Sequence, residues 1–470
     1  MVKRAWLETR CPYGRAGSNP APGEALPCGV LGGFVLFSQG FLLKRLFESC
    51  PRRSKFFKLN LPFCSMLHKL KEILSRGKKL RRYLSERVSQ LPKTRFGEIL
   101  RMAEEAKGII SLGPGEPDFD APAFIVRNSC RALKEGETHY SPPSGRIELK
   151  EAFAKKLKKE NKIKVNSLDE ILVTNGSTEG ILLALICLLD PGEECLVPDP
   201  GFLAYKPTVE MLNGFAVSMR LDEETGFQID LDATKKAISK RTRCLILNTP
   251  SNPTGTVFKR KFLEELADLV VENDLIVLSD EAYEKLIYND AKHISFASLN
   301  GMEEFTLSLF TCSKTFAIPG LRIGLLHGPE WLIKAMARIK LYSTLCAPTP
   351  FQLATAKALK SKEMQRETEK MRREYARRRK LILKRIDEIN GLEIKVKPEG
   401  AFYAFPRFYA KMDSFKFAEF LLKKAKVLVV PGIEFGKEGS NFIRMSYATA
   451  YAKIEKAMDR IEKVMKKLNF

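Results

Sequence analysis

The sequence predicts an α/β fold with a large domain built on a seven-stranded, mostly parallel sheet. Between residues 120 and 361, short apolar stretches alternate with longer helical patterns, as strands and crossover helices do in such a sheet. Several of these stretches end in polar residues, which is how buried strands present side chains at one edge. The chain of 470 residues is also long enough for two or three domains.

Seven stretches are expected as the strands of the sheet: Glu170–Thr174, Glu194–Pro198, Ala216–Met219, Cys244–Asn248, Leu275–Ser279, Phe305–Phe310 and Ile323–His327. A mixed-charge helix from Lys362 to Ile389 would lead to a smaller C-terminal α/β domain. That domain would hold strands near Tyr403 and from Val427 to Gly432, and a last helix from Tyr451 to Lys466.

We expect four regions along the chain. They are an extension at 1–66, an N-terminal arm that contributes to the small domain at 67–119, a large domain at 120–361 and a small C-terminal domain at 362–470. The small domain is therefore built from both ends of the chain. The arm region is basic and helical, and it ends in the amphipathic string Phe96–Arg101.

The first 66 residues differ from the rest of the chain. A Gly- and Pro-rich stretch precedes an apolar run, Val30–Leu43, that is too short to span a bilayer comfortably. The run starts late and no small-x-small cleavage site follows it, which argues against a signal peptide. We expect this segment to be disordered or to result from a start codon assigned too early, with Met66 as the true start.

The net charge of +23 could indicate binding to nucleic acid or to an anionic membrane. The basic residues, however, alternate with glutamates along helices such as Glu363–Arg385, which is typical of ion-paired, solvated helix faces. The ten cysteines include no CxxC pair, so neither a metal site nor a disulfide framework is expected. We therefore expect a cytoplasmic protein with reduced thiols, and neither nucleic acid nor membrane as a partner.

Lys314 is the most informative residue for function. It lies among small and hydroxyl residues in the run Thr311–Gly324, and Arg322 follows eight positions later. An amine in a partly desolvated pocket can lose its proton and attack an aldehyde, and a guanidinium suits a phosphate. An aldehyde with a phosphate suggests pyridoxal 5′-phosphate as cofactor. Taken alone, the run is also compatible with a surface lysine in a loop.

An acidic residue ends the apolar run Leu275–Ser279. Asp280 would come to the carboxyl edge of the sheet, where an anion keeps the pyridine nitrogen of the cofactor protonated. Tyr283, three residues on, is placed to donate to the phenolic oxygen of the cofactor. The alternative for Asp280 is a helix N-cap after a strand.

Two further strand ends complete the pattern. The stretch Ile171–Thr174 runs through a small-residue loop into an apolar helix, so Gly176, Ser177 and Thr178 would hold a phosphate with backbone N–H groups. The stretch Cys244–Asn248 runs into the turn Ser-Asn-Pro-Thr-Gly, which contains Asn252. A single junction of strand, glycine and helix usually reflects packing alone. The prediction of a phosphate site therefore depends on all of these segments together.

These strings together resemble fold type I enzymes that use pyridoxal phosphate, specifically class I/II aminotransferases of the archaeal aspartate/aromatic type. The resemblance covers roughly residues 84–470. It implies that Asn252 bonds the ring oxygen of the cofactor, that Phe202 stacks on the ring and that Thr311 and Ser313 belong to the cofactor site. Thr311 stands where the family usually has Ser or Gly, and Phe202 where Tyr or Trp is often found.

The resemblance also implies a substrate site and a shared assembly. Gly115, in the string Gly-Glu-Pro-Asp-Phe, would meet the substrate carboxylate with its backbone N–H, and Arg444 would hold the same carboxylate. Tyr140 would reach the cofactor phosphate of a neighbouring subunit, so we expect a homodimer with shared active sites.

The implied activity is transfer of an amino group between an L-amino acid, aromatic or aspartate, and a 2-oxo acid such as 2-oxoglutarate, in a ping-pong reaction. A C–S lyase or decarboxylase on the same scaffold is one alternative, because fold alone does not fix the reaction. A DNA-binding regulator with such a domain is the other. It is disfavoured because residues 1–84 show no helix-turn-helix periodicity.

Overall fold

The protein is described by a computed structural model that covers residues 83–91 and 96–468. The apolar run Val30–Leu43 and Met66 lie outside the described residues, so the expectations for the first 66 residues stay untested. Within the described residues, no helix combines the length and the apolar character needed to cross a bilayer.

All seven predicted strands are present in one sheet, which has an additional, eighth strand. Its strands are β2 (Ile171–Thr174), β3 (Glu194–Asp199), β4 (Phe215–Asp222), β5 (Gln228–Ile229), β6 (Thr242–Asn248), β7 (Ile276–Asp280), β8 (Thr306–Thr311) and β9 (Gly324–His327). They lie in the order β2-β9-β8-β7-β6-β3-β4-β5. Neighbours from β4 through β8 are parallel, whereas β9 is antiparallel to both β2 and β8, and β5 is antiparallel to β4.

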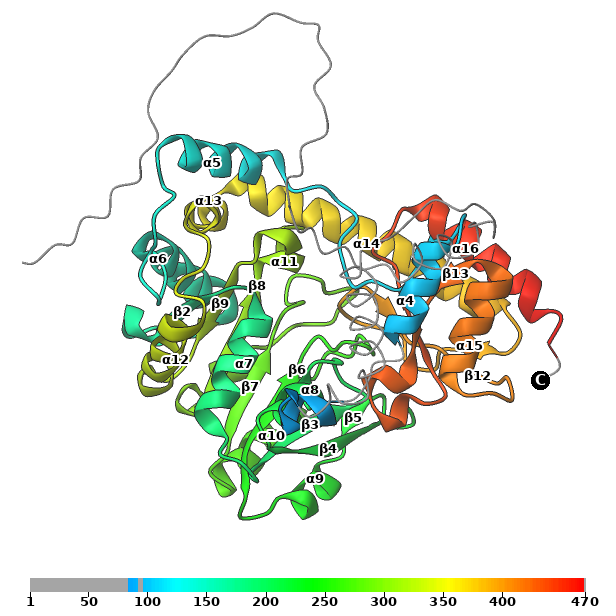
Figure 1. Cartoon of the computed structure of the whole chain (residues 1–470), viewed down its shortest axis with the longest axis horizontal. Helices are drawn as coiled ribbons and strands as arrows, with labels where there is room; N and C mark the ends of the chain where they lie inside the picture. The colour runs from blue at the N-terminus through cyan, green and yellow to red at the C-terminus, as the bar shows by residue number, and fades with distance from the viewer. Residues whose placement is uncertain (1–82, 92–95, 469–470) are drawn as a thin grey trace, which may run out of the picture. The chain divides into compact units, whose positions relative to one another are not determined.

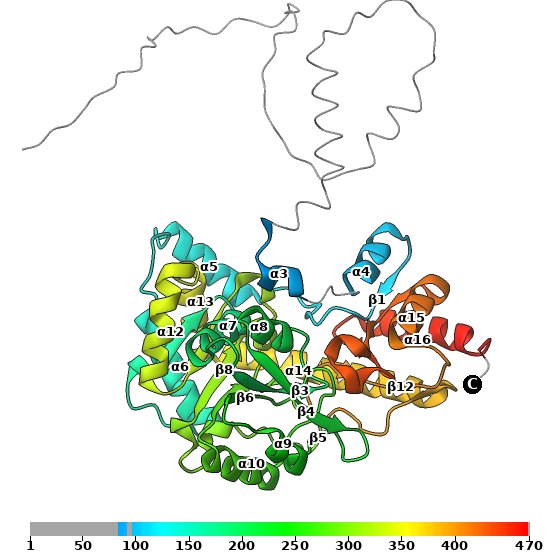
Figure 2. The ribbon, with the colours of Figure 1, turned by 60° about the horizontal axis from the view of Figure 1, so that its bottom comes forward.

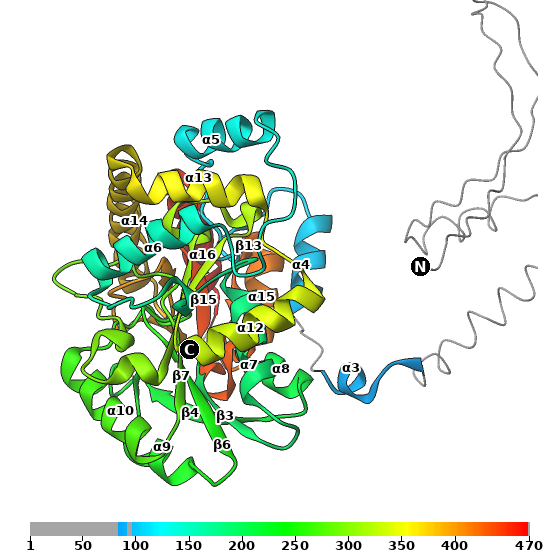
Figure 3. The ribbon, with the colours of Figure 1, turned by 90° about the vertical axis from the view of Figure 1, so that its left-hand side faces the viewer.

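Helices cover both faces of this sheet because its strands are apolar on both sides. On β2 and β9, Leu172 and Leu326 face one core, while their neighbours Val173 and Leu325 face another. The first core includes α7 (Ser177–Leu188), α8 (Tyr205–Met211) and α12 (Glu330–Ser343). The opposite face carries α6 (Ile147–Lys156), α9 (Leu231–Ala237), α10 (Arg260–Glu272) and α13 (Thr349–Lys360), and α5 (Ala123–Lys134) packs on α13. Figure 3 shows the sheet between these two layers.

A long helix, α14 (Lys362–Glu388), leads from the large sheet to a smaller α/β region, as Figure 1 shows. Its elements are α4 (Phe96–Glu105), β1 (Ile110–Ser111), β10 (Leu392–Glu393), β11 (Tyr403–Ala404), β12 (Arg407–Phe408), α15 (Ser414–Phe420), β13 (Val427–Leu428), β14 (Val430–Pro431), β15 (Ile443–Ser446) and α16 (Tyr451–Met465). A short helix, α3 (Glu86–Gln90), precedes them.

Both ends of the described chain build this smaller region, as the sequence predicts. Strand β1 pairs in parallel with β13, so that Ile110 lies opposite Val427. Ile99 of α4 is buried in the same apolar core as Ile461 of α16. Figure 2 shows α4 and β1 beside α15 and α16. A segment near residue 100 and one near residue 450 therefore stabilise each other.

The strand directions bring five chain segments to one edge of the large sheet. Asn248, Asp280 and Thr311 end the parallel strands β6, β7 and β8, and Thr174 ends β2. Gly324 begins β9, which runs the opposite way, so the residues that precede it reach the same edge. Side chains that are far apart in the sequence therefore meet at the carboxyl edge, where open α/β sheets bind their ligands.

Candidate active site

A cavity of about 330 Å³ opens at the carboxyl edge of the sheet. It has the size of a small-molecule site. Its lining contains every site residue predicted from the sequence except Tyr140: Gly115, Gly176, Ser177, Thr178, Phe202, Asn252, Asp280, Tyr283, Thr311, Ser313, Lys314, Arg322 and Arg444. The cavity also includes residues that the sequence reasoning did not select, among them Tyr205, Asn248 and Tyr403.

Lys314 lies on α11 (Cys312–Thr315), a single helical turn that follows β8 directly. The Thr311 side chain caps this turn by accepting a hydrogen bond from the backbone N–H of Ser313, at 3.2 Å. The half-buried Lys314 ammonium donates to the backbone carbonyl of Gly115. Burial, followed by the positive charge of Arg444, lowers the pKa of Lys314 to about 8. The amine is therefore much closer to its nucleophilic form at neutral pH than an exposed lysine is.

Three hydrogen bonds fix Asp280, which lines the cavity. Its Oδ2 accepts a hydrogen bond from the Tyr205 hydroxyl at 2.7 Å, and its Oδ1 accepts one from the backbone N–H of Ala282 at 3.2 Å. The Asn248 amide donates to the backbone carbonyl of Asp280 at 3.0 Å, which ties the ends of β6 and β7 together. Burial raises the pKa of the Asp280 carboxyl, and the hydrogen bond from Tyr205 opposes part of that rise.

The position of Tyr205 in the sequence could have predicted that it belongs to the site. Tyr205 follows the predicted stacking residue Phe202 by three positions, which is the spacing of neighbours on one side of a helical turn. The two rings pack edge to face with their centroids 5.5 Å apart. The same turn therefore supplies an aromatic wall and the hydroxyl that orients Asp280.

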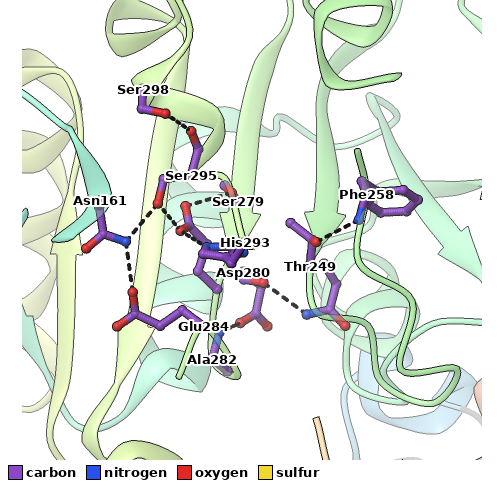
Figure 4. Close-up of polar contacts among 12 residues, drawn as sticks. Asn161, Thr249, Phe258, Ser279, Asp280, Ala282, Glu284, His293, Ser295 and Ser298 are labelled. Atoms are coloured by element: carbon purple, nitrogen blue, oxygen red, sulfur yellow. Dashed lines mark hydrogen bonds and ion pairs between the residues drawn. The ribbon is translucent and has the colours of Figure 1, made fainter. Parts of the chain in front are cut away.

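A polar network on the other side of the β7 terminus anchors the strand. Glu281 is fully buried and accepts hydrogen bonds from His293 at 2.7 Å and from Ser295. Asn161 joins Ser295 to Glu284 with bonds of 2.8 Å each, as Figure 4 shows. Because buried polar groups that find partners resist displacement, this network fixes the strand end that carries Asp280.

The loop that starts α7 approaches Arg322 closely. Gly176 is the N-cap of α7 and has a positive φ of 82°, a conformation that glycine adopts without strain. A Cβ atom at Gly176 would lie 2.4 Å from an Nη atom of Arg322, so a side chain would fill the space beside the guanidinium. Arg322 donates to the backbone carbonyl of Asn175 at 3.1 Å and to that of Pro319 at 2.8 Å. A helix N-terminus and a guanidinium thus face the same part of the cavity, as an anion requires.

Arg444 projects from β15 and is only 4% exposed. Its two Nη atoms donate to Asn252 Oδ1 at 2.9 Å and to the backbone carbonyl of Gly113 at 2.7 Å. Its Nε is buried and has no partner among the described residues. Since Asn252 uses its oxygen on Arg444, its amide NH₂ is the group left to donate to a ligand.

Two tyrosines of the cavity lining meet beside Arg444. The hydroxyls of Tyr283 and Tyr403 lie 2.8 Å apart, and the Arg444 guanidinium lies 4.2 Å from the centre of the Tyr403 ring. Burial raises the pKa of Tyr283, so its hydroxyl keeps its proton and remains a donor. A Cβ at Gly115 would fall 2.1 Å from the Tyr403 oxygen, which explains why glycine stands there.

Tyr140 lies apart from this cavity, and its side chain is 82% exposed. The backbone around it is nevertheless fixed. Thr349 donates to the carbonyl of His139 at 2.8 Å, and Gln352 donates to the buried Ser141 hydroxyl at 2.8 Å. The structure therefore presents an exposed tyrosine on an ordered segment, outside the site of its own chain.

Comparisons with known proteins identify relatives of this site. Residues 107–461 match the protein family described as aminotransferase class I and II. Aromatic-amino-acid aminotransferase 2 of Thermococcus litoralis and an aspartate aminotransferase of Pyrococcus abyssi are each 46% identical to this chain over 384 residues, which is 82% of this chain and 98% of each relative. The solved structure of an aromatic aminotransferase from Pyrococcus horikoshii is 48% identical, with a TM-score of 0.74, and the match covers 78% of this chain and 99% of that one.

The lowered pKa of Lys314 predicts a specific pH profile. In the protein freed of cofactor, the rate at which a small aldehyde labels Lys314, trapped with borohydride, should rise with pH to a midpoint near 8, because only the unprotonated amine attacks. At pH 7 about a tenth of the maximal rate is expected. Peptide mass spectrometry measures the label, with exposed Lys261 as the internal reference. A midpoint near the ordinary lysine value of 10.5 would contradict the assignment.

Proposed function

The chain belongs to the class I and II aminotransferases, and we propose that it moves an amino group between an aromatic L-amino acid or aspartate and a 2-oxo acid such as 2-oxoglutarate, by a ping-pong reaction. Enzymes of this family use pyridoxal phosphate. The observation that carries the proposal is that Lys314 shares one cavity with Asp280, Arg322 and Arg444. The lysine suits an aldehyde and the acid suits a pyridine nitrogen. One arginine suits a phosphate and the other a carboxylate.

The cavity residues fit pyridoxal phosphate. The N-terminus of α7 at Gly176–Thr178 and the Arg322 guanidinium would hold the phosphate, with the Thr311 and Ser313 hydroxyls nearby. Asp280 would hold the proton of the pyridine nitrogen, and Phe202 would cover the ring. The NH₂ of Asn252 and the Tyr283 hydroxyl are donors suited to the phenolic oxygen. Arg444 and Gly115 both line the cavity, so the guanidinium and the backbone N–H of Gly115 would hold the substrate carboxylate.

Bound pyridoxal phosphate supplies an aldehyde for the substrate amine and a ring that takes up negative charge from the α-carbon. The Lys314 amine would act as the base that takes the proton from the substrate α-carbon and later returns a proton. Its lowered pKa suits this task, because a base poised near the working pH can both accept and give up a proton. Arg444 holds the α-carboxylate and so orients the α-C–H bond.

The lining of the cavity favours an aromatic donor over aspartate. In the part of the chain that the structure describes, the cations of this lining are Lys314, Arg322 and Arg444, each of which has a role in the proposal. A second substrate carboxylate would need a cation from elsewhere, such as a partner subunit. Tyr403, by contrast, offers an aromatic surface to a substrate ring.

A panel of amino donors with 2-oxoglutarate tests the function. Tyrosine and phenylalanine should give higher kcat/KM than aspartate, and each should yield one 2-oxo acid per glutamate formed. Lys314→Ala should abolish the reaction, with the exposed-lysine variant Lys261→Ala as control. Release of ammonia, sulfide or carbon dioxide in place of glutamate would favour a lyase or decarboxylase and overturn the proposal.

The role of Asp280 has its own test. Asp280→Asn should still bind pyridoxal phosphate but lose activity by orders of magnitude, because a neutral amide no longer holds the ring proton. The absorption spectrum of the bound cofactor and single-turnover rates measure the two effects separately. Turnover close to that of the unmodified protein would mean that Asp280 only supports the strand end.

We also propose a homodimer in which the exposed Tyr140 completes the phosphate site of the partner. The exposure of Tyr140 on a hydrogen-bonded segment supports it, because the Tyr140 hydroxyl is free to contact a second subunit. A second large aromatic residue, Tyr342, is 85% exposed and is a further candidate for contact with a second subunit. A two-fold interface would give each subunit the same relation to the other.

Subunit mixing tests the shared site. Chains with Lys314→Ala and chains with Tyr140→Asp, each impaired alone, should regain activity together, because a hybrid dimer has one site with both residues intact. Random pairing predicts about a quarter of the unmodified activity, since half of the dimers are hybrids with one complete site of two. Activity assays after mixing, with sedimentation at assay concentration, measure this. A fully active monomer would refute the shared site.

The division of the chain and its location belong to the same proposal. The large domain would be residues 120–361, and the small domain would combine residues 362–470 with part of the arm at 67–119. The pairing of β1 with β13 supports this grouping. We place the enzyme in the cytoplasm, because ten cysteines without a metal-binding spacing suit a reducing compartment.

A further inference from the structure

A buried ion pair lies behind the loop that starts α7 and has no role in the mechanism above. Lys340, on α12, donates to Glu179, on α7, at 2.8 Å. The Lys340 side chain is 0% exposed and that of Glu179 is 10% exposed. The free-energy cost of removing two charges from water often exceeds their mutual attraction, so this pair calls for an explanation beyond stability.

Glu179 holds the loop on which the proposed phosphate site depends. One carboxylate oxygen accepts the backbone N–H of Asn175 at 2.6 Å, and the other accepts the Asn175 side-chain amide at 3.1 Å. The N-cap of α7 is Gly176, which has no side chain to cap the helix. Glu179, in the first turn of α7, caps the helix instead. Its side chain accepts the backbone N–H of Asn175, much as the glutamate of a capping box does. The Asn175–Gly176 turn is thus held by hydrogen bonds that the side chain at position 179 accepts.

That carboxylate creates an electrostatic conflict. Negative charge at a helix N-terminus is stabilised by the helix dipole, but the same N-terminus is where the proposed phosphate would bind. Burial disfavours the ionised form of Glu179, yet hydrogen bonds from Lys340, Thr344 and Asn175 outweigh it, so the pKa of Glu179 lies below its ordinary value. A full negative charge therefore remains close to the site of a second anion.

Lys340 is placed to remove this conflict. It lies in the last turn of α12, where a cation is favoured, and it also donates to Thr344 at 3.0 Å. Thr344 in turn donates to Glu179, so the carboxylate has four donated hydrogen bonds and one compensating charge. In a partly buried setting such a charge acts with little screening by salt.

We propose that Lys340 is a positioning residue for the cofactor phosphate, which neutralises Glu179 so that the Asn175–Gly176 turn is held by a carboxylate without repelling a phosphate dianion. The inference rests on the proposed function, because it assumes that the N-terminus of α7 is the phosphate site. It adds a residue that does not line the cavity and is 161 positions away from Glu179.

Binding of pyridoxal phosphate and of pyridoxal, which lacks the phosphate, separates this role from a purely structural one. Dissociation constants for both ligands are measured by fluorescence titration of the cofactor-free full-length protein. Lys340→Met should weaken pyridoxal phosphate by about tenfold or more, because an uncompensated Glu179 repels the phosphate, and leave pyridoxal unchanged. Lys334→Met, on the same helix but in an exposed ion pair, is the matched control and should change neither.

Removal of the other charge sharpens the test. Glu179→Gln alone should bind pyridoxal phosphate at least as tightly as the unmodified protein, and the double variant Glu179→Gln with Lys340→Met should recover most of the loss. A merely structural ion pair predicts instead that all three variants weaken both ligands together, which would overturn the inference. If Lys340→Met does not fold, as circular dichroism would show, the comparison of Glu179→Gln and the double variant decides on the same criterion.

Arg322→Met distinguishes failure of this inference from failure of the proposed function. If Arg322→Met weakens pyridoxal phosphate relative to pyridoxal and Lys340→Met does not, only the role of Lys340 is refuted. If neither variant distinguishes the two ligands, the phosphate site at the start of α7 is wrong, and the inference is overturned with it.

Discussion

The site depends on burying charged side chains while giving each of them a hydrogen-bond partner. Lys314, Asp280 and Arg444 share a cavity in which each charged group would be costly alone. The fold meets this cost with fixed dipoles: carbonyls of Gly113 and Gly115 accept from Arg444 and Lys314, and the Tyr205 hydroxyl donates to Asp280. The shifted pKa values of Lys314 and Asp280 both originate in burial, so the same desolvation that must be compensated also sets the chemistry.

The sheet makes this compensation possible because its strands end together. Asn248 lies opposite Asp280 in the register of β6 and β7, and its side chain crosses to the carbonyl of Asp280. The reverse direction of β9 returns the chain so that Arg322 faces the loop after β2. Behind this edge, the contacts of Glu281 and Asn161 hold β7 in place. Precision in the site thus comes from rigid strand ends more than from the loops that follow them.

The sequence alone predicted the seven strands, because an apolar run is a local feature. It named 13 of the 21 residues that line the cavity, and the family resemblance supplied about half of these. An apolar run that ends in Asp280, or a glycine between a strand and a helix at Gly176, can be read within ten residues. The eighth strand, β5, has only two residues and therefore leaves no periodic signal. Tyr403 and Lys340 were not predicted from the sequence. Their partners, Tyr283 and Glu179, are 120 and 161 positions away, and only the folded chain reveals such pairs.

The pairing of β1 with β13 has a consequence for how the protein is made. Residues near Ile110 leave the ribosome long before their partners near Val427, whereas every strand of the large sheet is complete by His327. At roughly 5–20 residues per second, the delay is on the order of 15–60 s. During that interval the apolar side chains of α4, such as Ile99, lack the core they will join. The strands of the large sheet can pair while β1 and α4 still lack their partners, so the smaller α/β region is the last part of the chain to assemble during synthesis.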